Sequence, residues 1–347
     1  MSDFASDNHA GGHPDLIDAV RRANEGHAGA YGADEWTARA EAGFREHFGA
    51  EARAFPVFNG TGANVVALDA LTRQFEAVIC TDVAHMHVDE CGAPERVAGT
   101  KLLTVAHSDG KLAPSDLRRW ESSRGDEHQV QPRLVSITQA TELGTVYTPD
   151  ETRGIAAEAH RLGMRVHLDG ARLSNAAASL GASLRELTTD AGVDVVSFGA
   201  TKNGALFGEA VVFLGPELGA DFAFHRKQLG QLASKMRFIS VQLEALLADG
   251  LWLRNAAHAN EMASRLAEAV AGIPAVELVY PVQANGVFAR LPRAAIERLL
   301  AELPGENPFY VWDAEANVVR WMCAWDTTPE GVDSFAAAVA EAAKTAA

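Results

Sequence analysis

The sequence predicts an α/β protein with a mainly parallel sheet between layers of helices, followed by a smaller α+β domain. As far as residue 214, short β-rich runs alternate with helical stretches, a pattern typical of parallel strands joined by helical crossovers. From about Ile273 onward, strands and helices follow in a different order. A chain of 347 residues also suits two unequal domains better than one core.

Seven strands are expected in the larger domain: Arg53–Phe58, Ala77–Cys80, Lys101–Val105, Arg133–Thr138, Met164–Leu168, Val193–Phe198 and Ala210–Leu214. Helical patterns cover Asp150–Arg161 and Leu173–Thr188, and a long region rich in Ala and Leu runs from about Phe222 to Val270. The alternation predicts crossovers that place helices on both faces of the sheet.

The smaller domain is expected to contain three strands and two helices: Val276–Tyr280, Gly286–Leu291, Val318–Met322, Arg293–Glu302 and Thr328–Lys344. We divide the chain into an N-terminal arm (1–15), a large domain (16–255) and a small C-terminal domain (256–347). The second boundary lies somewhere between Gly250 and Gly272.

Composition excludes several functional classes. The formal net charge is -16, whereas binders of nucleic acid or anionic membranes need a basic surface. No apolar run approaches the roughly 20 residues that a membrane helix requires. The N-terminus shows no export signal, and the three cysteines form no C-x-x-C pair, so we expect a soluble protein of the reducing cytoplasm.

Two residues carry the strongest chemical signal. Asp169 lies in Val-His-Leu-Asp-Gly-Ala-Arg and Lys202 in Ser-Phe-Gly-Ala-Thr-Lys-Asn-Gly, each just past a predicted strand. Strand ends of an open parallel sheet face one crevice, so the acid and the amine can meet although 33 positions separate them. Taken singly, Asp169 could cap a helix and Lys202 could be a solvated surface residue.

Pyridoxal chemistry requires this combination. The lysine binds the cofactor aldehyde as a Schiff base, while the aspartate keeps the pyridine nitrogen protonated so that the ring accepts electrons. The Gly-rich segment Phe58–Asn64 links a strand to a helix, and its Gly60 and Thr61 are candidate phosphate contacts at the helix start. A dinucleotide loop is the competing interpretation, but Val65 replaces its third glycine.

These residues belong to a longer series of landmarks. The chain resembles the bacterial low-specificity L-threonine aldolases among the fold-type I pyridoxal enzymes, and the matching segments span most of it in family order. They are Phe4-Ala-Ser-Asp-Asn8, Tyr31-Gly-Ala-Asp-Glu-Trp-Thr37, Asn59-Gly-Thr-Gly-Ala-Asn64, His85, Glu142, His167-Leu-Asp-Gly-Ala-Arg172, Ser197-Phe-Gly-Ala-Thr-Lys-Asn203 and Met236-Arg237.

The resemblance assigns roles to residues that are ordinary by themselves. It implies that Ser6 and Tyr31 lie in the active site, Tyr31 reaching in from a neighbouring subunit, and that His85 stacks on the pyridine ring. It also places His128 near the substrate's β-hydroxyl. Alone, His128 would be an exposed loop residue. His85 and His87 with Glu90 faintly suggest metal ligation, but no further ligand converges there, so we expect no metal.

Arginines are the natural ligands of a carboxylate, so Arg172 and Arg320 are candidates for binding the substrate's α-carboxylate. Arg320 is equally well explained as a solvated strand residue. Arg237 is a candidate for the cofactor phosphate or for a subunit interface, and Arg226 and Lys227 are weaker candidates.

The resemblance implies cleavage of an L-β-hydroxy-α-amino acid to glycine and an aldehyde. Threonine, allo-threonine and phenylserine all remain candidate substrates. Either His85 or His128 could be the base, because imidazole titrates near neutral pH. A β-eliminating lyase or aminotransferase on the same scaffold is the alternative, followed by a non-catalytic binding module. We expect a homodimer or homotetramer with active sites shared between subunits.

Overall fold

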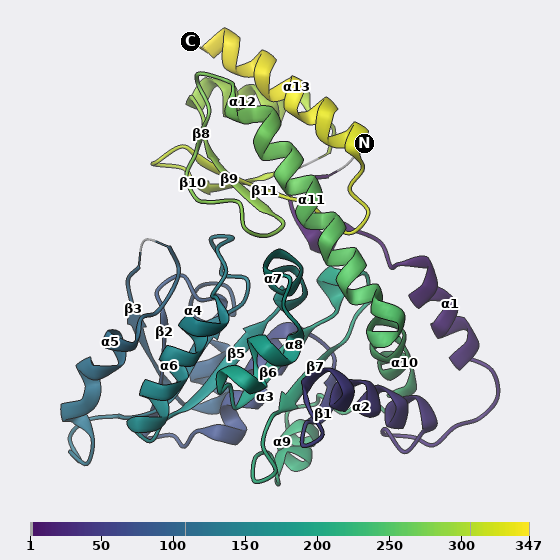
Figure 1. Ribbon diagram of the computed structural model, residues 1–347, viewed down its shortest axis with the longest axis vertical. Coiled ribbons are helices and arrows are strands. Elements are labelled where there is room, and N and C mark those ends of the chain that lie inside the picture. The colour runs from purple at the N-terminus through teal and green to yellow at the C-terminus, as the bar shows by residue number, and fades with distance from the viewer. Residues whose placement is uncertain (1–2, 108, 306, 347) are drawn as a thin grey trace.

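The computed structural model describes residues 3–107, 109–305 and 307–346, and it contains two sheets, one of seven and one of four strands (Figure 1). The seven strands lie in the order β1-β7-β6-β5-β4-β2-β3. Their bounds are β1 Arg53–Val57, β2 Glu76–Thr81, β3 Lys101–Val105, β4 Gln131–Thr138, β5 Arg165–Gly170, β6 Val195–Gly199 and β7 Glu209–Phe213. Each expected strand is therefore present, with ends shifted by up to two residues.

All neighbouring strands of this sheet run parallel except β7, which is antiparallel to both β1 and β6. The nine residues from Ala200 to Gly208 join β6 to β7, which is too short for a crossover, so the chain must return antiparallel. The expectation of a mainly parallel sheet is confirmed, with one reversed strand beside β6.

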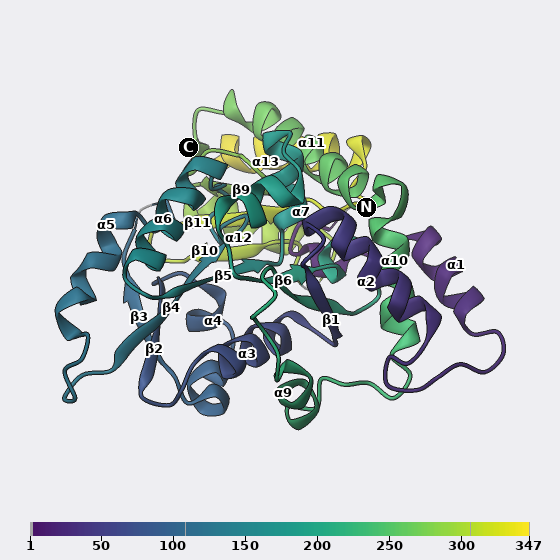
Figure 2. The same cartoon turned by 60° about the horizontal axis from the view of Figure 1, so that its bottom comes forward.

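Helices cover both faces of the sheet (Figure 2). The larger core joins one face to α2 (Glu35–Phe48), α6 (Pro149–Arg161), α7 (Leu173–Leu180), α8 (Leu184–Leu187) and α10 (Arg237–Leu247). The opposite face packs on α3 (Gly60–Leu71) and α9 (Phe222–Gln228). Neighbouring residues along β7 join different cores, Val211 with α3 and Val212 with the larger core, as the two-residue period of a strand dictates.

Two expected helices are interrupted. The helical region predicted from about Phe222 to Val270 forms three helices, α9, α10 and α11 (Leu251–Ala271), because Gly230 (φ 70°) and Gly250 (φ 68°) adopt left-handed backbone conformations. Gly181 (φ 61°) similarly divides the predicted Leu173–Thr188 helix into α7 and α8.

The second sheet has the order β10-β11-β9-β8, and all its pairs are antiparallel. Its strands are β8 Glu277–Leu278, β9 Gly286–Arg290, β10 Tyr310–Asp313 and β11 Val318–Met322, with helices α12 Arg293–Glu302 and α13 Pro329–Ala346. The sequence prediction missed β10. Helix α11 packs on α7 at the large sheet and on α13 at the small one (Figure 1). The proposed domain boundary after residue 255 falls inside this helix and stays a prediction.

The N-terminal arm packs against the small sheet. Phe4 stacks on Phe335 of α13 at 4.3 Å between ring centroids, and its carbonyl accepts a 2.8 Å hydrogen bond from the Met322 N–H. The arm continues through a short turn (η1, Asp7–His9) to α1 (Pro14–Ala23), which packs on α10. Within the described part of the chain, no helix has the length and apolar character needed to cross a membrane.

Candidate active site

One cavity collects residues from the carboxyl ends of four parallel strands. Asp169 lies near the end of β5, and Lys202 lies in the turn η5 (Thr201–Asn203) that follows β6. Gly60 begins α3 after β1, and His85 begins α4 (His85–Val88) after β2. The cavity measures about 360 Å³ and is lined by Asn8, Asn59, Gly60, Thr61, Ala63, His85, Asp169, Ala171, Ser197, Phe198, Gly199, Thr201, Lys202 and Glu209.

The start of α3 offers an anion site at one end of this cavity. The first N–H groups of a helix have no intrahelical acceptor. Asn59 caps the helix and its Oδ1 accepts from the Gly62 N–H at 2.7 Å, which leaves the N–H groups of Gly60 and Thr61 for a ligand. Together with the positive end of the helix dipole, these donors favour a phosphate.

A chain of hydrogen bonds connects Asp169 to His85. The Nδ2 atom of Asn64, on α3, donates to Asp169 Oδ2 at 2.8 Å and to Glu90 Oε1 at 2.9 Å. Glu90 Oε1 in turn lies 2.9 Å from His85 Nδ1. The second oxygen of Asp169 accepts from the Ala171 N–H at 3.1 Å. Asn64 and Glu90 are buried, so the network fixes the aspartate and the imidazole relative to each other.

This network also sets the protonation of His85. The hydrogen bond to Glu90 raises the pKa of His85 above its ordinary value, and burial raises the pKa of Glu90. Because an ionised Glu90 only accepts hydrogen bonds, the His85 proton sits on Nδ1, and Nε2 is the nitrogen left to accept one. The backbone N–H of His85 donates to Glu142 Oε1 at 2.7 Å, and burial raises the pKa of this second carboxyl to about 7.

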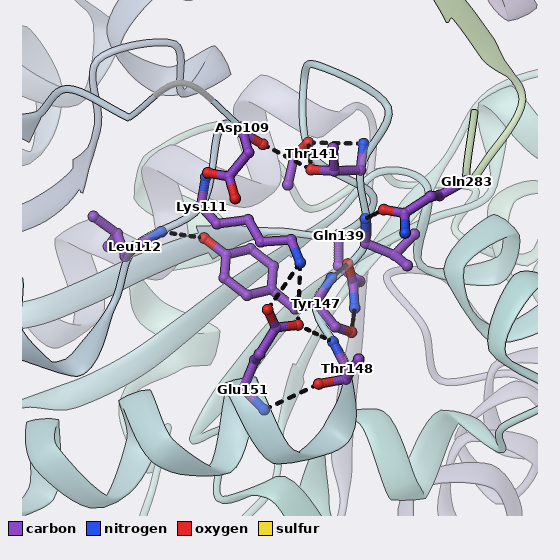
Figure 3. Close-up of polar contacts among 11 residues, drawn as sticks. Asp109, Lys111, Leu112, Gln139, Thr141, Tyr147, Thr148, Glu151 and Gln283 are labelled. Atoms are coloured by element: carbon purple, nitrogen blue, oxygen red, sulfur yellow. Dashed lines mark hydrogen bonds and ion pairs between the residues drawn. The ribbon is translucent and has the colours of Figure 1, made fainter. Parts of the chain in front are cut away.

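The loop that carries Glu142, residues 139–148, is held by its own polar contacts (Figure 3). The Gln139 side chain donates to the Tyr147 carbonyl at 2.7 Å and accepts from its N–H at 3.0 Å. The Val146 N–H donates to Gln283 Oε1 at 3.0 Å, which ties the loop to the segment that precedes β9. The buried loop is therefore a rigid support rather than a mobile cover.

Lys202 is prepared to react as an amine. The nearby positive charge of Arg172 and burial both lower its pKa, although Asp7 and Asp169 act in the opposite direction. A lower pKa increases the fraction of neutral amine, which is the nucleophilic form.

Two arginines lie beside the cavity, where the two sheets meet. Arg172 binds Asp7 through both Nε (2.7 Å) and Nη2 (2.8 Å), and Asn285 donates to the same carboxylate at 3.0 Å. These contacts with Arg172 keep the pKa of Asp7 below its usual value although burial would raise it. Arg320 lies across a small cavity lined by Arg172 and Asn285, and its buried Nε has no hydrogen-bond partner among the described residues.

Both guanidinium groups thus approach one point from opposite sheets. Arg320 stacks on Tyr310 and Trp312, whose ring centroids lie 5.1 and 5.2 Å from its Cζ atom. Burial and the neighbouring Arg172 lower its pKa to about 10. An anionic ligand between the two arginines would relieve their repulsion and use the free Nε donor.

The remaining predicted residues lie elsewhere. Ser6 is buried in η1, where its Oγ accepts from the Asn8 N–H, and it faces a separate depression near α13. Tyr31 is 52% exposed, and its ring lies 4.8 Å from Lys227 Nζ. Arg237 begins α10 and donates to the Gly26 carbonyl at 3.3 Å. Neither Tyr31 nor Arg237 lines the cavity of its own chain.

His128 lies away from the cavity of its own chain, and its assignment as a candidate base stays a prediction. It lies on an exposed loop just before β4, at the amino end of the strand, whereas the cavity lies at the carboxyl ends. A strand of eight residues separates the two edges by roughly 25 Å. Of the two histidines, the structure brings only His85 into the cavity.

Several residues of the site had no assigned role in the sequence analysis. Asn64 stood in a motif without a function, and Glu90 was weighed as a metal ligand, although it binds a histidine and an amide instead. Asp7 lay inside the Phe4–Asn8 landmark, but its partner Arg172 is 165 positions away. Glu209, buried at the start of β7, carried no motif signal.

The residues present fit pyridoxal phosphate. A reactive amine, a carboxylate and an anion site line the same cavity, and the free N–H groups of α3 provide a phosphate cradle that the protein itself does not fill. Asp169 is a carboxylate available to a pyridine nitrogen, and Asn64 and Glu90 connect it to His85, which lines the same cavity.

Comparisons with known proteins identify the family and several relatives of this chain. The model of the beta-eliminating lyase family matches residues 3–293. Low-specificity L-threonine aldolases from a Pseudomonas species and from Pseudomonas aeruginosa are both 49% identical, covering 96% of this chain and 96% and 95% of their own. A solved threonine aldolase from Leishmania major superimposes with a TM-score of 0.91 at 30% identity, over 97% of this chain and 98% of the other.

Proposed function

Because this chain belongs to the beta-eliminating lyase family and is a pyridoxal-phosphate-dependent lyase of the L-threonine aldolase type, we propose that Lys202, Asp169 and the start of α3 hold the cofactor. The reaction is the retro-aldol cleavage of an L-β-hydroxy-α-amino acid to glycine and an aldehyde. The observation that carries the assignment of residues is the convergence of Lys202, Asp169 and Gly60 on one cavity.

When bound, pyridoxal phosphate supplies an electron-poor ring that accepts the electron pair released by Cα–Cβ cleavage. Lys202 holds the aldehyde end, and Gly60 and Thr61 hold the phosphate through backbone N–H groups. Asp169, fixed by Asn64 and by the Ala171 N–H, places a negative charge at the pyridine nitrogen.

Arg172 and Arg320 bind the substrate's α-carboxylate between the two sheets. Asp7 occupies two of the guanidinium nitrogens of Arg172, so its Nη1 remains for the substrate, while Arg320 contributes its free Nε. Two charge-assisted contacts orient the amino acid by its carboxylate, which exposes the same Cα substituents to the cofactor in every cycle.

His85 is the group in this chain that can take the β-hydroxyl proton. Its Nδ1–H points to Glu90, so Nε2 can accept a proton, directly or through a water molecule, and the resulting imidazolium is stabilised by the carboxylate. Glu90 and Asn64 therefore act as positioning residues behind His85 and Asp169.

The experiment that tests these assignments uses Lys202→Ala, with Lys101→Ala on the exposed edge of β3 as control. Aldehyde release from L-threonine, L-allo-threonine and phenylserine is measured with added pyridoxal phosphate. We expect the Lys202 variant to lose the visible absorbance of the lysine-bound cofactor and the aldolase activity, while the control keeps both. Retention of both by Lys202→Ala would refute the assignment.

We propose that the enzyme is a homodimer or homotetramer in which Tyr31 and Arg237 serve the cavity of a neighbouring subunit. Both lie outside the cavity of their own chain, and Leu206 and Phe207, in the segment between Lys202 and β7, are 44% and 42% exposed. Such side chains favour burial against a second copy.

Mixing inactive variants tests this sharing. Hetero-oligomers of Lys202→Ala with Tyr31→Ala contain one intact site per pair if Tyr31 crosses the interface. Refolding a one-to-one mixture should then recover about a quarter of the native activity, because half of the pairs are mixed and each has one working site. No recovery, or an active monomer in sedimentation experiments, would contradict the proposal.

We also propose a cytoplasmic location. Its support is that Cys80, Cys91 and Cys323 are all free thiols, as expected in a reducing compartment. Cell fractionation with an activity assay tests this, and activity confined to an exported fraction would contradict it.

A further inference from the structure

A buried carboxyl group stands between the two places where the cofactor is anchored. Glu209 is the first residue of β7, is 7% exposed and lines the same cavity as Lys202. In the sheet it pairs with Val57 of β1 on one side and Gly199 of β6 on the other. The first strand leads directly to the α3 phosphate site, and the second leads to the turn that carries Lys202.

The Glu209 carboxylate accepts hydrogen bonds from that turn. Its Oε2 accepts a 2.5 Å hydrogen bond from the Ala200 N–H, and both the N–H and the hydroxyl of Thr201 also donate to the carboxylate. These donors come from the two residues immediately before Lys202. Turn η5 is only three residues long and has no side-chain cap of its own, so Glu209 supplies the acceptors that its buried donors need.

Electrostatics couple the same pair. The positive charge of Lys202 lowers the pKa of Glu209, which burial raises to about 7, and Glu209 in turn favours the charged form of Lys202. Lys202 also faces Arg172, whose charge disfavours its protonation, and Asp7 and Asp169, whose charges favour it. Among these charged groups, Glu209 is the one that also accepts hydrogen bonds from the backbone immediately before Lys202.

We propose that Glu209 is a positioning residue that fixes the Lys202 turn and tunes the charge of the amine that binds the cofactor. It acts through Ala200 and Thr201 rather than on the substrate. The proposal rests on the assignment of Lys202 as the cofactor-bearing residue, which the Lys202→Ala experiment tests separately.

Two substitutions separate the hydrogen bonds from the charge. Glu209→Gln keeps the side-chain size and one acceptor oxygen but loses the charge, whereas Glu209→Ala loses both. Glu217→Gln, at an exposed position in the loop after β7, is the matched control. Apo-protein of each variant is titrated with pyridoxal phosphate by visible absorbance, and the absorbance of the bound form is then followed against pH.

The affinity for pyridoxal phosphate should decrease with the number of hydrogen bonds that residue 209 can no longer accept. We expect the dissociation constant of pyridoxal phosphate to rise about tenfold in Glu209→Ala and less in Glu209→Gln, because buried donors lose their acceptors. Pyridoxine 5′-phosphate, which has no aldehyde for the lysine, should bind all variants alike. The pH midpoint of the absorbance change should depend on the charge of residue 209. Because both substitutions remove the negative charge that favours the protonated nitrogen of Lys202, the midpoint should move to lower pH by a similar amount in both variants.

The outcomes distinguish a failure of the role proposed for Glu209 from a failure of the assignment of Lys202. Unchanged affinity in Glu209→Ala, or a midpoint in Glu209→Gln equal to that of the native enzyme and of Glu217→Gln, would overturn the proposal. Equal weakening of pyridoxine phosphate would overturn it as well, because it would indicate a general loss of structure. Thermal unfolding of each apo-protein detects such a loss of structure independently, as a lowered Tm. Absence of cofactor absorbance in the native protein would refute the Lys202 assignment itself.

Discussion

Replacing Glu90 by alanine should lower kcat/KM and move its acid limb to lower pH. The side chain makes the hydrogen bond that raises the pKa of His85, and its buried Oε1 also accepts from Asn64. A hydrogen bond to a charged partner contributes about 1.5–3 kcal/mol, and each 1.4 kcal/mol changes a rate tenfold, so the loss should be about 10- to 100-fold.

The sign of the pH effect follows from the proposed role of His85 as the base. His85 must be neutral to accept a proton, so activity rises as the pH increases through its pKa. Because Glu90 raises that pKa, removing Glu90 lowers it, and the acid limb moves toward lower pH. Glu90→Gln still offers an oxygen to the Nδ1–H of His85, so kcat/KM should fall less than in Glu90→Ala. The acid limb of its pH profile should still move to lower pH.

The assay is kcat/KM for aldehyde release over about pH 5 to about pH 9, a range that brackets an imidazole. Glu95→Gln, an exposed glutamate nearby in the sequence, is the control. If both Glu90 variants kept the native pH limb while losing activity, Glu90 would be a structural residue only, and the reasoning about His85 would be refuted.

Three further predictions concern other contacts. Asp7→Asn weakens the support of Arg172, so KM should rise about tenfold with a smaller change in kcat in steady-state kinetics; a change in kcat alone would contradict it. Burial raises the pKa of Glu142 from 4.5 to about 7, so its ionisation costs folding free energy over that range. Native stability should therefore fall between these pH values, whereas the stability of Glu142→Gln should not. In urea unfolding, the free energy of unfolding of the variant should rise relative to that of the native protein by up to about 3 kcal/mol from the lower pH to the higher. The same pH dependence of stability in both proteins would refute this. Phe4→Ala removes the ring stacked on Phe335 and should cost about 3–5 kcal/mol in the same assay; a loss below about 1 kcal/mol would show that the arm is not part of the core.

The parts of the fold that depend on local sequence were predictable. Short β-rich runs predicted the seven strands, and the residues after two of these runs identified the Asp169–Lys202 pair. The missed features depend on other information. Gly230 and Gly250 interrupt the predicted long helix through left-handed backbone conformations, which the Ala- and Leu-rich composition obscured. Strand β10 is short and half-exposed, and its pairing with β11 is irregular, so its hydrophobic pattern is weak.

Within the site, the sequence predicted residues with distinctive chemistry and missed those defined by their partners. Lys202 had a motif, whereas Glu209 is one glutamate among many until the sheet pairs it with Gly199. The same holds for Glu90, whose contact with Asn64 joins residues 26 positions apart. Conversely, the family resemblance placed His128 near the substrate, whereas the direction of β4 puts it at the other edge of the sheet in its own chain.

The packing of the N-terminal arm has a consequence for the moment at which the enzyme becomes competent. Phe4 is made more than 300 residues before Met322 and Phe335, the residues that hold it in place. Chains are synthesised at about 5–20 residues per second, so the arm waits for roughly 15 to 70 seconds before its place exists. Until the small sheet is made, Arg172, which we propose binds the substrate, has no anchored Asp7 beside it. We therefore expect a chain that stops before the small sheet to be inactive even when it contains Lys202.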